Sequence, residues 1–221
     1  MNAAYDNLLT RRSVRKYKPE QISDEELYAV LKAGMYAPTA MGRQSPLIVA
    51  VQDKDDIARL SSLNAQIMGA GSDPFYGAPT VVVVFAQAGN RNGVQDASLV
   101  MGNMMNAAHA LGLGSCWVNR AHETFELPEG RELLAKWEVE GDWIGVGNCL
   151  LGYPDGDLPE AKPRRSGYVM VKKKDGPAAL GDPAWRFFIP SGARGSAELA
   201  QEVDHLYGAL GALAALVAGL G

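Results

Sequence analysis

Three arginines and a serine stand within five positions near the start of the chain, at Arg11, Arg12, Ser13 and Arg15. A guanidinium group donates several hydrogen bonds in one plane and therefore matches the oxygens of a phosphate, and a serine hydroxyl adds a donor at short range. The segment follows a short predicted amphipathic helix, so it would lie on a turn. Two interpretations are open from this segment alone: an anion-binding turn or a solvated basic patch.

A second basic cluster lies late in the chain, at Lys162, Arg164 and Arg165. The whole chain carries a net charge of −4, so its basic residues are concentrated locally, and the composition gives no support for nucleic-acid binding. If the early and late clusters converge in the fold, they form a pocket for a phosphate.

A turn is predicted where a proline ends a helix. Ser23 and Glu26 form a capping box that opens this helix, and Pro38 ends it because the residue before a proline avoids the α-helical conformation. Residues 38–44 would then form a turn that leads into a strand at 47–51.

Apolar patterns predict an α+β domain with a buried central helix. The β-branched run at 80–85 is typical of a central strand buried on both faces, and the helix predicted at 95–111 is apolar nearly all round. Asp96, near the start of that helix, is interpreted as a cap or dipole partner, and His109 as a core histidine. Further strands are predicted at 115–118, 144–151 and 168–171, the last of which would close the domain, and a short helix at 128–136.

Six segments together resemble the nitroreductase family of flavin-dependent oxidoreductases. They are residues 11–15 (RRSVR), 37–44 (APTAMGRQ), 73–79 (DPFYGAP), 111–117 (LGLGSCW), 147–153 (GNCLLGY) and 161–165 (AKPRR). Their order and spacing agree with the family from about residue 3 to residue 174. One position departs from the family pattern, because Gly42 stands where an asparagine is usual and one expected side-chain contact is missing.

The resemblance implies a nitroreductase-like α+β fold, in which a central mixed or antiparallel sheet is flanked by helices and two chains form an intertwined homodimer. It implies FMN as the cofactor, NADPH or NADH as the electron donor, and a nitroaromatic, quinone or flavin as the acceptor in ping-pong hydride transfer. The flavin carries this chemistry, so no side chain is assigned as catalytic. The helix with Val100, Met101, Met104 and Met105 would cross the dimer core.

The resemblance also assigns contacts to the cofactor. At the phosphate they are Arg11 and Ser13, with Arg164 or Arg165. The others are Arg12 and Arg15 at the ribityl and ring oxygens, Gln44 and Asn64 as amides, Pro38 and Thr39 from the partner subunit, and Gly114 and Ser115 as backbone against the ring, where a side chain would clash. Met41 and Arg43 are candidates for the substrate face. No metal site is expected, because His122, Glu123 and Glu126 lack a further ligand at suitable spacing and fit a surface loop.

Three regions are predicted along the chain: an FMN-binding domain at 1–174, a linker at 175–196 and a helical extension at 197–221. The aromatic cluster at 185–188 is expected to dock on a groove. Apolar residues alternate four and three apart from Leu199 to Leu220, which predicts a coiled-coil seam. Higher assembly through this helix is the leading interpretation, and peripheral membrane contact is the second.

An FMN-dependent NAD(P)H oxidoreductase is the leading hypothesis for function. The alternative is a non-catalytic flavin- or ligand-binding module whose C-terminal helix mediates assembly, and a flavin-fragmenting or dehalogenating relative is a third possibility. Cys116 and Cys149 lie in apolar stretches without C-x-x-C spacing, so we expect buried free thiols, which suit a reducing cytoplasm. The first residues lack the pattern of a signal peptide.

Overall fold

The computed structural model describes residues 2–173 and 176–179 of the chain. The chain divides into two compact units, residues 1–161 and residues 162–221, and each is described by itself. The predicted aromatic cluster at 185–188 and the predicted helix at 197–221 lie outside the described residues.

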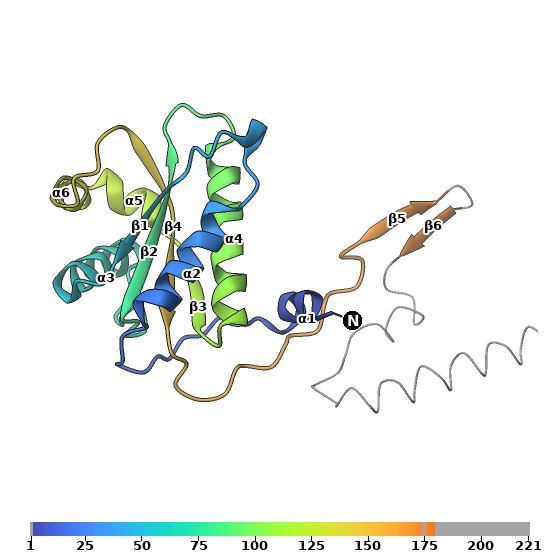
Figure 1. The fold of residues 1–221 in the computed structure, drawn as a ribbon. Helices are drawn as coiled ribbons and strands as arrows, with labels where there is room; N and C mark the ends of the chain where they lie inside the picture. Colours follow the sequence, from blue (N-terminus) through green and yellow to red (C-terminus); the bar gives the residue numbers. More distant parts are fainter. Residues whose placement is uncertain (1, 174–175, 180–221) are drawn as a thin grey trace, which may run out of the picture. The chain divides into compact units, whose positions relative to one another are not determined.

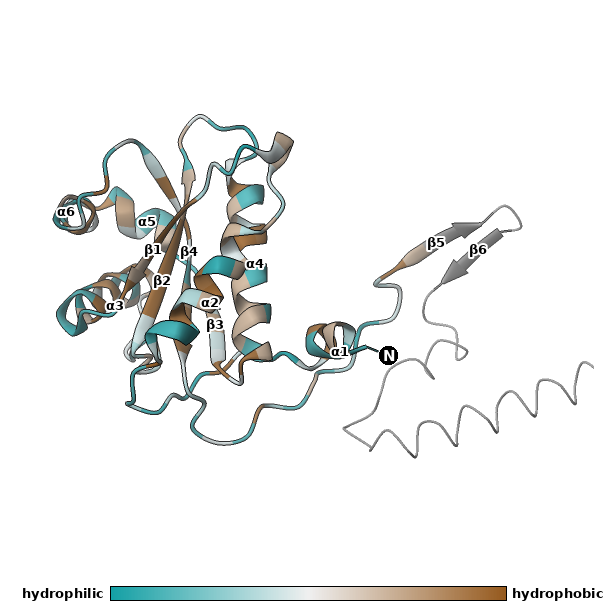
Figure 2. Cartoon of the chain, in the orientation of Figure 1, coloured by the Kyte–Doolittle hydropathy of each residue, from teal (hydrophilic) through white to brown (hydrophobic). Residues whose placement is uncertain are grey.

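The first unit contains a four-stranded sheet with the order β1-β2-β4-β3 (Figure 1). Its strands are β1 (Leu47–Val51), β2 (Thr80–Gln87), β3 (Gly114–Val118) and β4 (Trp143–Gly152). All three pairings are antiparallel. The side chains of β2 from Thr80 to Ala86 are buried, and β1 and β2 are coloured as hydrophobic in Figure 2. The apolar run at 80–85 therefore forms the central strand that the sequence predicts.

Helices cover both faces of this sheet (Figure 1). On one face lie α2 (Asp24–Met35) and α4 (Gly93–Ala110), and on the other lie α3 (Lys54–Met68), α5 (Ala121–Glu126) and α6 (Pro128–Lys136). A hydrophobic core lies on each face of the sheet, and alternate residues of β2 pack into the two cores. Val82 and Val84 pack toward α2 and α4, whereas Val81 and Val83 pack toward α3, α5 and α6. The helix α1 (Ala3–Thr10) contacts the end of α4.

Local signals place several elements as predicted. The capping box at Ser23 and Glu26 is present, and the helix at 128–136 has the predicted bounds. The helix α3, which opens with Asp53 as its N-cap, was not predicted. The surface loop predicted around His122 was wrong: these residues form α5, in which His122 lies 3.4 Å from Glu126 one turn further along.

The apolar helix α4 is buried mostly within its own chain. Val100, Met101 and Met104 are buried in the core between α4, α2 and the sheet, so they are not available to a partner. The face of α4 that stays open carries Val94 and Leu99. If α4 meets a second copy, it does so through this other face.

The second unit contains a two-stranded antiparallel sheet of β5 (Met170–Lys173) and β6 (Gly176–Ala179). The strand predicted at 168–171 was expected to close the main domain. It pairs with β6 instead, so residues 176–179 of the predicted linker form a strand. Within the described residues no helix is both long enough and apolar enough to cross a bilayer.

Candidate functional site

The basic segment at 11–15 is fixed to the start of β3. Ser13 and Ser115 form an isolated parallel bridge, and the backbone N–H of Val14 donates to the carbonyl oxygen of Ser115 at 3.0 Å. A Cβ atom on Gly114 would lie 2.9 Å from Val14 Cγ1, so only a glycine allows this approach. The clash predicted at Gly114 is therefore with Val14 of the same chain.

Two guanidinium groups in this segment keep donors without partners. Arg12 Nη1 donates to the carbonyl oxygens of Leu9 and Arg11, both at 2.8 Å. Arg11 Nη1 and Arg12 Nε are buried and have no hydrogen-bond partner among the described residues. A buried donor left unpaired costs about 1–3 kcal/mol, so these two atoms favour an acceptor from outside the chain.

A small cavity of about 280 Å³ lies beside the same segment. It is lined by residues 13–16 and by residues 154–159. Lys16 Nζ lies 2.6 Å from Asp155 Oδ2 across this cavity, whereas Arg15 is exposed and Ser13 is half-buried. Among the residues that line the cavity, Arg15 therefore carries the positive charge that is not paired with a carboxylate of the described part of the chain.

The C-terminal end of α4 contacts Thr10, which directly precedes the basic segment. His109 Nε2 lies 2.9 Å from Thr10 Oγ1, and that hydroxyl donates its only proton to the carbonyl oxygen of Asp6 at 2.7 Å. His109 Nε2 must therefore be the donor, as in a neutral imidazole. Burial, and then the charges of Arg11 and Arg12, lower the pKa of His109. His109 is half-buried at this contact, so its assignment to the core was wrong.

A buried thiol and a buried phenol lie beneath the segment. Burial raises the pKa of Cys116, and Arg15 and Ser13 only partly oppose this effect. Burial also raises the pKa of Tyr17, whose hydroxyl donates to the carbonyl oxygen of Val14 at 2.9 Å. Both groups stay protonated at neutral pH, so neither is an anion that would compete with a bound phosphate.

The turn at residues 39–44 forms a second candidate region. It contains a short 3₁₀ helix, η1 (Ala40–Gly42), and its backbone is left-handed at Met41 (φ 56°), Gly42 (φ 64°) and Gln44 (φ 52°). The N–H of Gln44 donates to Thr39 Oγ1 at 3.0 Å. Glycine and asparagine both adopt positive φ more readily than other residues, so Gly42 preserves the backbone of the turn although it lacks the family's amide.

The two regions lie at opposite ends of α4. The turn is bound to Asp96 in the first turn of α4, whereas the basic segment adjoins His109 in the last turn. A helix rises about 1.5 Å per residue, so about 20 Å of helix separates them. One chain therefore brings Arg11, Arg12, Ser13, Gly114 and Ser115 together, but it keeps Pro38, Thr39 and Gln44 apart from them.

Three predicted contacts remain, one on α3 and two in the second unit. Asn64 is buried on α3, and its Nδ2 donates to the carbonyl oxygen of Asn119 at 2.8 Å. Arg164 and Arg165 belong to the second unit, where Arg164 Nη2 donates to the carbonyl oxygen of Lys162 and Arg165 lies 5.2 Å from the ring centre of Tyr168. The convergence of the early and late basic clusters stays a prediction.

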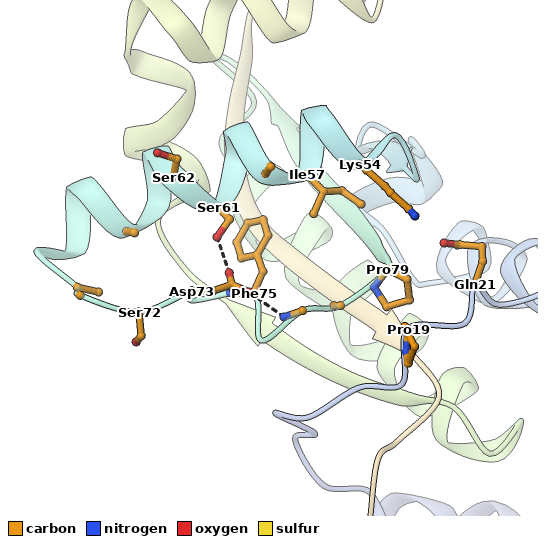
Figure 3. A pocket seen from close by; sticks show the side chains of 16 residues that line it. Pro19, Gln21, Lys54, Ile57, Ser61, Ser62, Ser72, Asp73, Phe75 and Pro79 are labelled. Carbon is orange, nitrogen blue, oxygen red and sulfur yellow. Dashed lines mark hydrogen bonds between the residues drawn. The ribbon is translucent and has the colours of Figure 1, made fainter.

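A groove of about 810 Å³ lies between α3 and the loop before β2. Ile57, Ser61 and Lys54 line the helical wall, and Asp73 and Phe75 lie on the loop (Figure 3). Asp73 accepts from Ser61 Oγ and from the backbone N–H groups of Phe75 and Gly77, so the loop is held to the helix. None of the predicted cofactor contacts lines this groove.

Comparison with known proteins identifies the family. Residues 8–134 match the model of the nitroreductase family. The chain belongs to the nitroreductase family. This match covers more than half of the chain and includes the basic segment, the turn at 39–44 and β3.

Nitroreductase relatives also agree over most of their length. A nitroreductase of Bacteroides fragilis, whose crystal structure has bound FMN, is 30% identical with a TM-score of 0.70, and the match covers 78% of this chain and 100% of that chain. A protein of Archaeoglobus fulgidus, named as a candidate NADH dehydrogenase/NAD(P)H nitroreductase, is 32% identical over 71% of this chain and 90% of its own. An FMN reductase [NAD(P)H] of Bacillus subtilis is 25% identical over 74% of this chain and 70% of its own.

Asp96 was predicted only as a cap or dipole partner of its own helix, and Thr10 was given no role. The roles of Thr10 and Asp96 depend on contacts with residues far along the chain, so their types alone did not reveal them. The unusual burial of a charged residue such as Asp96 is visible only in the fold.

Proposed function

We propose that this chain is an FMN-dependent oxidoreductase that takes electrons from NADPH or NADH. The observation that carries the proposal is the pair of buried, unpartnered guanidinium donors on Arg11 and Arg12, beside Ser13 at the start of β3. A phosphate supplies acceptors of matching charge and geometry for such donors. The bound FMN of the Bacteroides fragilis nitroreductase supports the same cofactor.

Each side chain has a proposed role toward the cofactor. Arg11 and Ser13 would hold the phosphate, with Arg164 or Arg165 added from the second unit. Arg12 and Arg15 would approach the ribityl and ring oxygens. The amide of Gln44 would face the ring. Asn64, whose buried Oδ1 has no partner among the described residues, would contact the cofactor through its amide. Gly114 and Ser115 would contact it through their backbone.

FMN, when bound, accepts a hydride from the nicotinamide and passes reducing equivalents to the acceptor. The chain's own residues bind and orient it, and a positive charge near the ring stabilises its reduced, anionic form. Nitroaromatics, quinones and free flavins are the proposed acceptors, reached after the nicotinamide leaves. The buried free thiols of Cys116 and Cys149 suit a cytoplasmic enzyme.

The working unit is proposed to be a homodimer. Apolar side chains stay exposed on α1, α2 and the open face of α4, among them Leu8, Tyr28 and Leu99. An antiparallel two-fold pairing of α4 with its copy would cover this surface. It would also bring the turn at 39–44 of one chain to the basic segment of the other, where Pro38 and Thr39 would cover the ring.

The experiment that tests this function is an absorbance spectrum of the purified protein under anaerobic conditions, before and after NADPH or NADH is added. We expect oxidised-flavin bands that bleach on reduction and return when a quinone or nitroaromatic is supplied. A colourless protein that cannot be reconstituted with FMN would refute the proposal and favour a binding module. Bands that neither donor bleaches would retain the cofactor but refute the NAD(P)H reaction.

A further inference from the structure

Asp96 is a buried carboxylate with one strong contact. The residue is 4% exposed, and its Oδ1 accepts a hydrogen bond from the backbone N–H of Ala40 at 2.9 Å. Its Oδ2 is buried without a hydrogen-bond partner among the described residues. An acidic residue in the first turn of a helix interacts favourably with the helix dipole, but that interaction does not require its carboxylate to bind a backbone N–H of another segment. The dipole therefore does not explain why Asp96 is buried against Ala40.

The partner of Asp96 is an exposed turn that contains two non-glycine residues with positive φ. Met41 and Gln44 have left-handed φ angles, which non-glycine residues adopt at a cost of about 1–2 kcal/mol each. Two side-chain oxygens accept hydrogen bonds from the backbone of this turn. Asp96 Oδ1 accepts from the N–H of Ala40, and Thr39 Oγ1 accepts from the N–H of Gln44. Met41, at the tip of the turn, is 76% exposed, so packing of its side chain does not fix the turn.

We propose that Asp96 is a positioning residue, which holds the turn at 39–44 in the conformation that meets the electron acceptor above the flavin. The inference rests on the proposed function. It deepens that function by assigning acceptor binding, rather than cofactor binding, to a residue at the end of α4 opposite the basic segment. Asp96 acts through the turn, and Met41 and Arg43 are the side chains it presents.

Three substitutions separate this role from a general loss of stability. Asp96→Leu removes the acceptor for Ala40 N–H, whereas Asp96→Asn retains an oxygen at the same position. Ala40→Pro removes the donor instead. Proline suits Ala40, because Thr39 before it is extended (φ −128°, ψ 153°) and Ala40 opens a 3₁₀ helix. Asp56→Asn is the matched control, since Asp56 is similarly buried but lies on α3, across the sheet.

The measurements are acceptor KM and kcat with a quinone and a nitroaromatic, FMN content, and amide exchange of peptides covering residues 38–46. Asp96→Leu is expected to raise acceptor KM roughly tenfold, as expected for one lost buried hydrogen bond. FMN content should stay close to that of the wild type, because Arg11 and Ser13 of the basic segment would hold the phosphate, and exchange at 38–46 should become faster. Asp96→Asn should stay close to wild type. Ala40→Pro should raise KM as Asp96→Leu does, and the double variant should be no worse than either, because both remove the same bond.

Several results would overturn the inference: an unchanged KM in Asp96→Leu despite faster exchange, an equal rise in KM in Asp56→Asn, or a loss of FMN in Asp96→Leu. A wild-type protein without flavin would refute the proposed function and the acceptor role with it. The exchange data would still decide whether Asp96 anchors the turn, so the two failures are distinguishable.

Discussion

Arg11 is the residue on which cofactor binding is expected to depend most directly. Its Nη1 is buried without a partner among the described residues, so removing the side chain costs the fold little. A hydrogen bond to a charged group contributes about 1.5–3 kcal/mol, so Arg11→Ala should weaken FMN binding by roughly 10- to 150-fold. Titration of the flavin-free protein with FMN, followed by fluorescence, measures this.

Arg59→Ala is the control for Arg11→Ala, because Arg59 is partly exposed and forms its ion pair with Glu132, between α3 and α6. Its FMN affinity should equal that of the wild type. An unchanged affinity in Arg11→Ala, or an equal loss in Arg59→Ala, would contradict the assignment of the phosphate to the basic segment.

Residue types predicted part of the site because their chemistry is local. Three arginines and a serine in five positions suit either an anion site or a solvated basic patch, and the structure leaves two of the arginines with buried donors that have no partner among the described residues. Asn64 was predicted from its amide alone, yet its Nδ2 is engaged with Asn119. The anchor at Asp96 joins two segments far apart in sequence, so no local pattern could reveal it.

At the scale of elements, Asp56 joins α3 to α6 and makes stability depend on pH. Its carboxylate accepts from Lys136 Nζ at 2.6 Å and from Trp137 Nε1 at 2.8 Å. Burial raises the pKa of Asp56, but the hydrogen bonds from Lys136 and Trp137 outweigh burial and hold it below its ordinary value. A carboxyl group with a lowered pKa stabilises the fold above its unfolded pKa, about 4, and loses that effect as pH falls through the folded pKa.

The expected result is a melting temperature that is lower in Asp56→Asn than in the wild type at pH 7, because about 1–3 kcal/mol of hydrogen bonding is lost. Below about pH 4 the two curves should converge. Thermal unfolding between pH 3 and pH 7 measures the difference, with the exposed Glu129→Gln on α6 as the control. A difference that stays constant at low pH would mean that the carboxylate charge has no part in joining the helices.

Elements with local signals were predictable, and those fixed by distant contacts were not. Three elements were predicted from patterns within their own segments: β2 from its β-branched run, α2 from its capping box and α6 from the proline at its start. The helix α3 was missed although Asp53 caps it and Leu60 and Leu63 pack into the core. The pairing of β5 with β6 depends on which strand is available to it, and sequence pattern alone does not fix that choice.

At the scale of the whole molecule, the proposed homodimer would join two candidate regions that α4 separates within one chain. Within one chain about 20 Å of helix lies between the basic segment and the turn at 39–44. An antiparallel pairing of α4 with its copy would join each basic segment to the other chain's turn. Each flavin site would then combine Arg11 of one subunit with Asp96 of the other.

A mixed dimer of Arg11→Ala and Asp96→Leu subunits tests this arrangement, because each subunit carries one defect. If sites are shared between chains, one site of the mixed dimer receives both defects and the other receives none. We therefore expect FMN at half the wild-type content and an acceptor KM equal to that of the wild type. Two different affinity tags allow the mixed dimer to be purified, and the two parent dimers serve as controls. If each site lay within one chain, every flavin-containing site would carry the Asp96→Leu defect, and KM would equal that of the Asp96→Leu dimer.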